Sequence, residues 1–196
     1  MASRGRGLRV VAGELRGRGI QVAPGTRPTI DRLRAAVFDS LGAPPPPRVL
    51  DCYAGSGAFG IEALSRGAEY VRFIERDSRA CAVIRANLRR LELEHAAGVE
   101  RADVLRADLA AGGPYGLILA DPPYADDPWI PLMNRLAQPG VLSADGLIVA
   151  EFSARHAVPE PPPTWQVWKM RRHGDGAFAI YCRLGNGKSE DEPTSL

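Results

Sequence analysis

The chain has 196 residues, of which 45% are hydrophobic, and this length and composition fit one ordinary domain with a full core and a small extension. Its apolar runs are all shorter than the roughly 18 residues of a membrane span, and residues 1–7 lack the apolar segment of a secretory signal, so we expect a cytoplasmic protein that enters no membrane. The three cysteines and three histidines are scattered without metal-ligand spacing, so we expect no metal site.

The net charge of +2 is unevenly distributed along the chain. Residues 1–34 hold eight arginines and two acids, a net charge of +6, whereas the rest of the chain is mildly acidic. A basic arm on an acidic body is typical of a protein that binds nucleic acid. The chain also holds 23 arginines and only two lysines, so a solvated face in an arginine-rich protein explains the charge equally well.

Residues 8–22 predict two short strands joined by a turn that contains glycine and arginine. A two-stranded hairpin is marginal alone, so it must lean on the body of the protein or on a partner. The arginines of this arm and of the next segment would contact phosphates, and those that we assign to this role are Arg4, Arg6, Arg9, Arg16, Arg18, Arg27 and Arg32.

A helix is expected after the arm, because apolar residues recur at helical spacing from Ile30 to Leu41. Thr29 is a candidate N-cap for this helix. We expect Arg27, Arg32 and Arg34 either on a solvated face of the helix or on a lip over the active site that holds cofactor or RNA. Four prolines then form a stiff spacer, which divides the chain into an arm at 1–43, the spacer at 44–47, a body at 48–184 and a polar, disordered tail at 185–196.

Residues 48–60 predict a strand, a glycine turn and the start of a helix that continues to Gly67. This is the context that a nucleotide-binding glycine loop requires. Gly55 and Gly57 permit a tight turn and the close approach of a ligand to the backbone. Many α/β turns carry similar glycines, so this loop alone is weak evidence.

A second apolar run, at 71–75, strengthens the nucleotide hypothesis. It ends in Glu75, which lies 24 residues after Asp51. An acid at about this spacing, at the end of the next strand, accepts hydrogen bonds from the ribose hydroxyls of a nucleotide. The alternative is an ordinary surface acid at a strand end.

The next two elements are a helix and a third strand. Ser78 would cap a helix that runs to about Leu91. A strand near 98–102 would end at Asp103, which could accept a hydrogen bond from an adenine amino group, with Asp108 as the competing marker.

The sequence Asp121-Pro122-Pro123-Tyr124 follows an apolar run at 116–120. The run predicts a buried parallel strand, and Asp121 should lie at its carboxyl end, where ligands bind in open α/β sheets. The carboxylate accepts hydrogen bonds, the prolines offer carbonyls without N–H donors, and the tyrosine ring provides a flat surface. These groups suit a planar partner with N–H donors, such as a nucleobase amine, although Asp-Pro also commonly starts an exposed turn.

The last third of the chain predicts a helix at 129–136 and a fifth strand at 146–152. Residues 165–170 and 177–184 alternate apolar and polar and are joined by a glycine turn, so they predict a hairpin that closes the sheet. Strands that alternate with helices indicate an α/β protein.

The acid-ended strands along one sheet edge resemble a Rossmann-like class I S-adenosylmethionine-dependent methyltransferase over residues 48–184. The resemblance implies a mostly parallel seven-stranded sheet with an antiparallel C-terminal hairpin strand, and an N-terminal hairpin and helix as an extension. It implies S-adenosylmethionine as the cofactor and no metal. The cofactor contacts that it implies come from Asp51, Tyr53, Ala54, Gly55, Ser56, Gly57, Gly60, Glu75, Arg76, Asp103, Val104 and Asp121.

The motif at 121–124 resembles the signature of amino-methyltransferases that act on nitrogens conjugated to planar systems. This likeness implies catalytic roles for Asp121, Pro122 and Tyr124. Exocyclic nucleobase amines are acceptors of this kind.

The arm narrows the match. Its segments 9–13, 16–18 and 26–34, followed in the body by 51–57 and 62–67, are similar to bacterial 16S ribosomal RNA guanine-N2 methyltransferases of the RsmD family. The resemblance implies that a monomer with a basic RNA-binding arm methylates the N2 amine of a guanine in 16S rRNA, within the small subunit or its assembly intermediate. Ala35 stands where this family usually has Glu, and Asp39 where Asn is common.

Two other functions stay open on the sequence. The first is an amino-methyltransferase with another acceptor, such as DNA adenine N6, a guanine of 23S rRNA or a protein glutamine. The arginine arm favours nucleic acid, and no segment is long enough for the separate target-recognition domain of a DNA enzyme. The second is a non-catalytic RNA-binding assembly factor, against which Asp121 and Glu75 argue.

Overall fold

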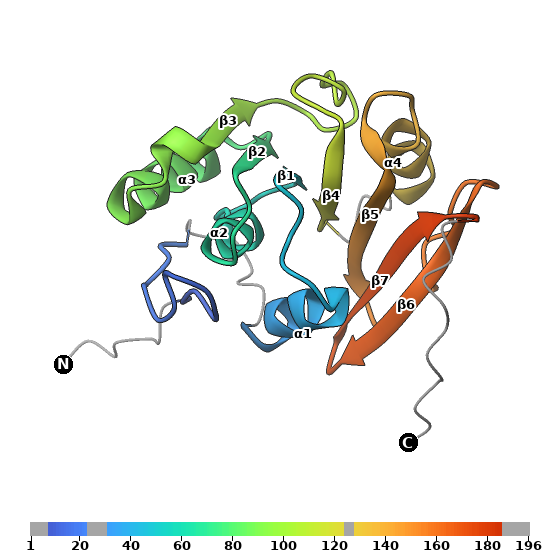
Figure 1. Ribbon diagram of the computed structural model, residues 1–196, viewed down its shortest axis with the longest axis horizontal. Helices are drawn as coiled ribbons and strands as arrows, with labels where there is room; N and C mark the ends of the chain where they lie inside the picture. Colours follow the sequence, from blue (N-terminus) through green and yellow to red (C-terminus); the bar gives the residue numbers. More distant parts are fainter. Residues whose placement is uncertain (1–7, 23–30, 124–127, 186–196) are drawn as a thin grey trace.

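The computed structural model describes residues 8–22, 31–123 and 128–185 (Figure 1). The seven strands of these ranges form one sheet in the order β3-β2-β1-β4-β5-β7-β6. The strands are β1 (Arg48–Cys52), β2 (Tyr70–Glu75), β3 (Ala97–Arg101), β4 (Tyr115–Ala120), β5 (Leu142–Ser153), β6 (Trp165–His173) and β7 (Gly176–Arg183). The first five strands pair in parallel, and β7 pairs antiparallel with both β5 and β6, which confirms the predicted fold class.

The helices cover both faces of the sheet, as the two apolar clusters of the core require. The helices are α1 (Asp31–Leu41), α2 (Ala58–Ser65), α3 (Ser78–Leu91), α4 (Trp129–Leu136) and the short 3₁₀ helix η1 (Glu94–Ala96). One cluster joins apolar residues of the arm, α1, α2 and α3 to odd-numbered residues of β1, β4 and β5. The other cluster joins α4 to the even-numbered residues of the same strands.

The order of the strands reverses between β1 and β4. The chain runs outward from β1 to β3 at the sheet edge and then returns to β4, which pairs with β1 through Cys52 and Ala120. Such a reversal leaves a crevice outside the carboxyl ends of the two strands, where ligands of open α/β sheets bind. The loop after β1 and the motif after β4 therefore meet at this point.

The arm at residues 8–22 differs from the predicted pair of strands. Its strand pairing is limited to one antiparallel bridge, between Arg9 and Gly19, flanked by backbone hydrogen bonds that cross between the two segments. A side chain of α2 supplies further hydrogen bonds: the two carboxylate oxygens of Glu62 accept the N–H groups of Val11 and Ala12 at 2.8 and 2.9 Å. The arm leans on the body, and its buried Leu8, Val10 and Ile20 share the core of α2 and α3.

Two local predictions were wrong. Arg34, expected on a solvated face or lip, is fully buried, because its guanidinium bonds to Glu62 at 3.3 Å and Asp31 at 2.8 Å. The cap of α3 is Asp77, whose carboxylate accepts the N–H groups of the next turn, and Ser78 is the first helical residue. Both residue types are good caps, so the sequence left a one-residue ambiguity.

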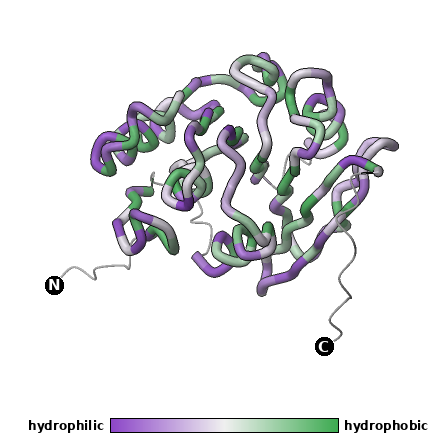
Figure 2. Tube along the Cα trace, in the orientation of Figure 1, coloured by the Kyte–Doolittle hydropathy of each residue, from purple (hydrophilic) through white to green (hydrophobic). Residues whose placement is uncertain are grey.

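The edge strand β6 is the most hydrophilic of the described strands. Most of its residues are exposed or half-buried, and Figure 2 shows hydrophilic residues at the end of the hairpin that it forms with β7. Charged residues such as Lys169, Arg171 and Arg172 on an edge strand hinder pairing with other chains.

Candidate active site

Four acids lie at the carboxyl ends of four neighbouring strands. In sheet order they are Glu75 on β2, Asp51 on β1, Asp121 after β4 and Glu151 on β5. Because side chains alternate along a strand, each acid shares its face with the core residue two positions earlier, and all four of those residues belong to the cluster beneath α1 and α2: Phe73, Val49, Leu119 and Val149. The four carboxylates thus form a row on one face of one sheet edge.

Glu75 is fixed by two backbone groups. One carboxylate oxygen accepts the N–H of Gly55 and the other the N–H of Asp77, both at 2.8 Å. Each carboxylate oxygen has a second lone pair, so the group can still accept hydrogen bonds from a ligand. This anchoring ties the glycine loop to the start of α3 at the position expected for ribose recognition.

The loop between β1 and α2 takes a backbone that favours glycine. Gly55 and Gly57 have φ angles of 54° and 78°, and Tyr53 has 58°, an uncommon value for a residue with a side chain. A Cβ on Gly60 would lie 2.2 Å from the ring of Phe73, so α2 packs directly on β2. The backbone N–H groups of the loop are therefore brought close to the sheet edge.

Asp51 connects the loop to the row of acids. Its carboxylate accepts the N–H of Gly60 at 2.9 Å. Burial raises the pKa of the Asp51 carboxyl well above its usual range, the Gly60 hydrogen bond opposes this shift, and the negative charges of Asp121 and Glu75 add to it. An excess of negative charge at a partly desolvated edge favours a cationic ligand, and the sulfonium of S-adenosylmethionine fits that requirement.

The remaining predicted cofactor residues lie in different environments. Ala54 is half-buried, and Ser56 is buried with its carbonyl accepting the side-chain N–H of Asn87 at 3.1 Å. Asp103 is half-exposed and accepts the N–H of Leu105. The exposed Arg76 follows β2, whereas Val104 is buried in the apolar cluster of α4, so only its backbone is available to a ligand.

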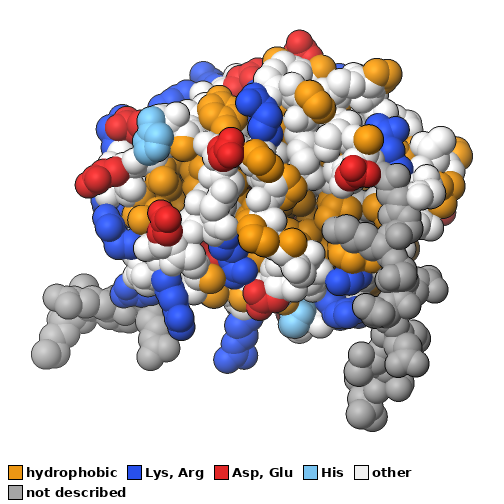
Figure 3. Space-filling model, viewed as in Figure 1, with side chains coloured by type: hydrophobic (Ala, Val, Ile, Leu, Met, Phe, Trp, Pro, Cys, Tyr) orange, Lys and Arg blue, Asp and Glu red, His pale blue; other side chains and the backbone are white. Residues whose placement is uncertain are grey.

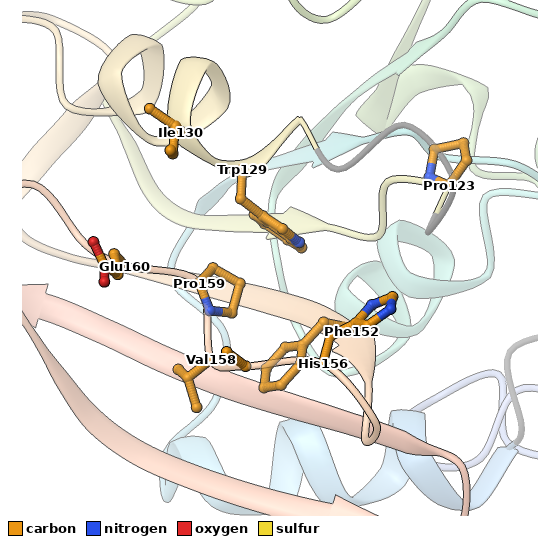
Figure 4. A pocket seen from close by; sticks show the side chains of 9 residues that line it. Pro123, Trp129, Ile130, Phe152, His156, Val158, Pro159 and Glu160 are labelled. Carbon is orange, nitrogen blue, oxygen red and sulfur yellow. The ribbon is translucent and has the colours of Figure 1, made fainter.

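The motif after β4 lies beside the glycine loop. Asp121 is half-buried, Pro122 is buried and Pro123 is exposed, while Tyr124 lies outside the described residues. A pocket of about 380 Å³ opens next to Pro123 on the α4 side of the sheet. Figure 4 shows Pro123 and His156 at one end of it and Glu160 at the other, with Trp129, Phe152 and Pro159 between them.

The described arginines of the predicted phosphate-binding set are all exposed. Arg9 donates to the carbonyl of Gly17 and Arg18 to that of Arg90. Figure 3 shows Lys and Arg side chains along the lower rim of the molecule, where the arm and α1 lie in Figure 1. The predicted Arg4, Arg6 and Arg27 lie outside the described residues, as do Thr29 and the tail from 186 to 196.

Sequence reasoning missed several buried polar residues. Glu151 ends the apolar run 146–150 in the same way that Asp121 ends its own, so that signal was present and unused. The buried side chains of α2 and α3 that bind the arm are Glu62, Ser65 and Asn87. They carried no local signal, because their partners in the arm are about 50 or more residues away in the sequence.

This strand order, the glycine loop, the acid at the end of β2 that anchors it and the acid-proline motif define a Rossmann-like, S-adenosylmethionine-dependent methyltransferase. A family model described as "Conserved hypothetical protein 95" matches residues 8–182, so the chain belongs to this family, the RsmD family.

Individual relatives agree with that membership. The chain is 37% identical over 189 residues to "Putative rRNA methyltransferase YlbH" of Bacillus subtilis, covering 91% of this chain and 100% of the relative. It is 33% identical over 187 residues to ribosomal RNA small subunit methyltransferase D of Escherichia coli K12, covering 93% of each. The solved structure of yhhF from Escherichia coli superimposes with a TM-score of 0.79 at 31% identity, covering 90% of this chain and 97% of that one.

Proposed function

We propose that this protein methylates small-subunit ribosomal RNA, transferring a methyl group from S-adenosylmethionine to the exocyclic N2 amine of a guanine in 16S rRNA. The observation that carries the proposal is the position of Asp121 and Pro122 at the strand reversal, between the glycine loop after β1 and the next acid, Glu151. The substrate class follows from the relatives, whose names describe rRNA and small-subunit rRNA methyltransferases.

The chemistry asked of the protein is the activation of a poor nucleophile. The lone pair of a guanine N2 is delocalised into the ring, so hydrogen bonds from its N–H groups to the Asp121 carboxylate and the Pro122 carbonyl would favour a pyramidal, more reactive nitrogen. The cofactor, when bound, would supply an electrophilic methyl group. Residues that orient the base toward it would contribute most of the remaining acceleration, and Asp121 need not be a strong base, because the amine becomes acidic once it is methylated and can lose its proton to solvent.

The base must leave its stack to reach this edge. Stacking of the guanine on the ring of Tyr124 would contribute about 1–3 kcal/mol. Phosphate contacts by the exposed arginines of the arm and of α1 would hold the surrounding RNA. We expect a monomer to act on the small subunit or on its assembly intermediate.

The decisive experiment incubates the protein and labelled S-adenosylmethionine with small subunits from a strain that lacks this methylation, and then maps the labelled nucleotide. Label in N2-methylguanine of 16S rRNA is expected. Label in another base, in 23S rRNA or in protein identifies a different acceptor. Absence of label in RNA and protein alike leaves the non-catalytic assembly factor.

The role of Asp121 is tested separately with Asp121→Ala. We expect kcat to fall by about 100-fold or more, because hydrogen bonds made to the reacting group act in the transition state, while the cofactor dissociation constant stays within a few-fold. Asp145→Ala, which removes an exposed acid at the other end of β5, is the matched control and should leave both quantities unchanged. Normal turnover in Asp121→Ala would remove this residue from the mechanism.

A further inference from the structure

Glu151 is a buried acid whose bonding is incomplete. The residue is 6% exposed, and its Oε2 atom has no hydrogen-bond partner in the part of the chain that the structure describes. Buried carboxylates normally have several partners, because an unpaired buried acceptor costs free energy. An orphaned carboxylate oxygen at a ligand-binding edge therefore indicates a donor that arrives with the ligand.

Its position in the sheet places Glu151 next to Asp121. Strands β4 and β5 pair in parallel through Ala120 and Ala150, so the two acids follow a matched pair of residues on adjacent strands. Both project from the face beneath α1, and the charge of Asp121 contributes, after burial, to the raised pKa of the Glu151 carboxyl. Glu151 lies on the side of Asp121 opposite Asp51 and Glu75, away from the glycine loop after β1.

Arg34 acts on Glu151 without a hydrogen bond to this oxygen. It lowers the pKa of Glu151 electrostatically, while its Nε and Nη2 donate to Glu62, Asp31 and the carbonyl of Arg9, and its Nη1 has no partner among the described residues. Two acids on adjacent strands, neither of them hydrogen-bonded to this guanidinium, can accept neighbouring N–H donors from a ligand.

We propose that Glu151 reads the Watson–Crick edge of the acceptor, with Oε2 accepting the N1–H of the guanine whose N2 amine is held by Asp121. This inference rests on the proposed function. Guanine carries N–H donors on adjacent N1 and N2, whereas adenine and 2,6-diaminopurine carry an acceptor at N1. A carboxylate facing that acceptor would be left unpaired, so Glu151 would select guanine by rejecting bases that lack the N1 donor.

The test compares guanine with 2,6-diaminopurine, which retains the reactive 2-amine, at the mapped nucleotide of ligated RNA reconstituted into small subunits. The wild-type protein should prefer guanine by about 100-fold or more in kcat/KM. In Glu151→Gln the side-chain amide can donate to N1 of 2,6-diaminopurine, so the preference should fall by about tenfold or more. Asp145→Asn, an exposed acid on the same strand, should keep the wild-type ratio.

Every outcome bears on one of the two proposals. An unchanged ratio in a Glu151→Gln protein that binds the cofactor normally would overturn the role of Glu151. If that variant fails to fold, the wild-type comparison still decides, because equal use of both bases also overturns it. Absence of methylation at any guanine of the wild-type reaction would instead overturn the proposed function.

Discussion

At the scale of single residues, the four acids of the sheet edge differ through their neighbours. Glu75 accepts two backbone N–H groups and Asp51 accepts one, whereas an oxygen of Glu151 has none among the described residues. A carboxylate held by backbone donors is a rigid acceptor, suited to neutral hydroxyls. A buried carboxylate whose oxygen has no hydrogen-bond partner depends on the ligand to supply one. Position along the edge and local bonding together are the basis on which we propose different roles for these acids.

The ribose assignment predicts the effect of Glu75→Ala. We expect the cofactor dissociation constant, measured by calorimetry, to rise by about tenfold or more, because two ribose hydroxyls lose their acceptor and the N–H of Gly55 loses its anchor. Glu69→Ala, an exposed acid just before the other end of β2, is the matched control and should bind as the wild type does. Unchanged binding in a folded Glu75→Ala protein would show that the ribose lies elsewhere.

At the scale of elements, the arm is held by side chains rather than by a sheet. Ser65 accepts the N–H of Leu15 at 3.0 Å and donates to the carbonyl of Ala12 at 2.6 Å, and Asn87 binds both backbone groups of Gln21. Such side-chain bonds satisfy backbone groups that a marginal hairpin would leave to water.

This docking predicts different costs for two glycines with the same backbone conformation. Gly13 and Gly17 have φ angles of 80° and 82°, but a Cβ would lie 1.8 Å from the backbone oxygen of Ser65 at Gly13 and meets nothing within 4 Å at Gly17. The strain of the left-handed backbone is common to both. Gly13→Ala should therefore lower the free energy of unfolding by about 1–3 kcal/mol more than Gly17→Ala in urea denaturation. Equal losses would mean that the arm is not docked on α2.

How well the sequence predicted each element depends on where its partners lie. Strands β1, β2 and β4 were predicted because each is a local apolar run that ends at an acid or a proline. The same local logic gave Asp51, Glu75 and Asp121 as neighbours at one edge. It failed for Arg34, whose burial depends on Glu62, 28 residues away, and for the arm, whose hydrogen bonds come from helices that follow it in the chain.

At the scale of the whole molecule, the glycine loop after β1 and the motif after β4 meet at the strand reversal, and the basic arm packs on the helices of the same face. Asn87 joins the arm to the glycine loop directly, because its side chain bonds the backbone of Gln21 in the arm and the carbonyl of Ser56 in the loop. Complete removal of the arm would expose the core residues that pack against Leu8, Val10 and Ile20. It would also leave the buried Glu62 carboxylate without its backbone donors, so a loss of RNA binding could not be told apart from a loss of folding.

A test of RNA binding must therefore change charge and leave the docking intact. Arg16 and Arg32 are both exposed, one on the arm and one on α1. Each phosphate contact contributes about 0.7–0.9 to the slope of log K against log salt, so Arg16→Gln combined with Arg32→Gln should flatten the slope for 16S rRNA by about 1.4–1.8. Arg106→Gln, whose side chain is 88% exposed in the loop after β3, is the matched control and should leave the slope unchanged. Cofactor affinity should be the same in the double variant and in the wild type, because neither Arg16 nor Arg32 belongs to the glycine loop or to the row of acids. A slope unaltered by the double substitution would mean that the positive charge of the arm does not face the RNA, and that its role is confined to packing on α2 and α3.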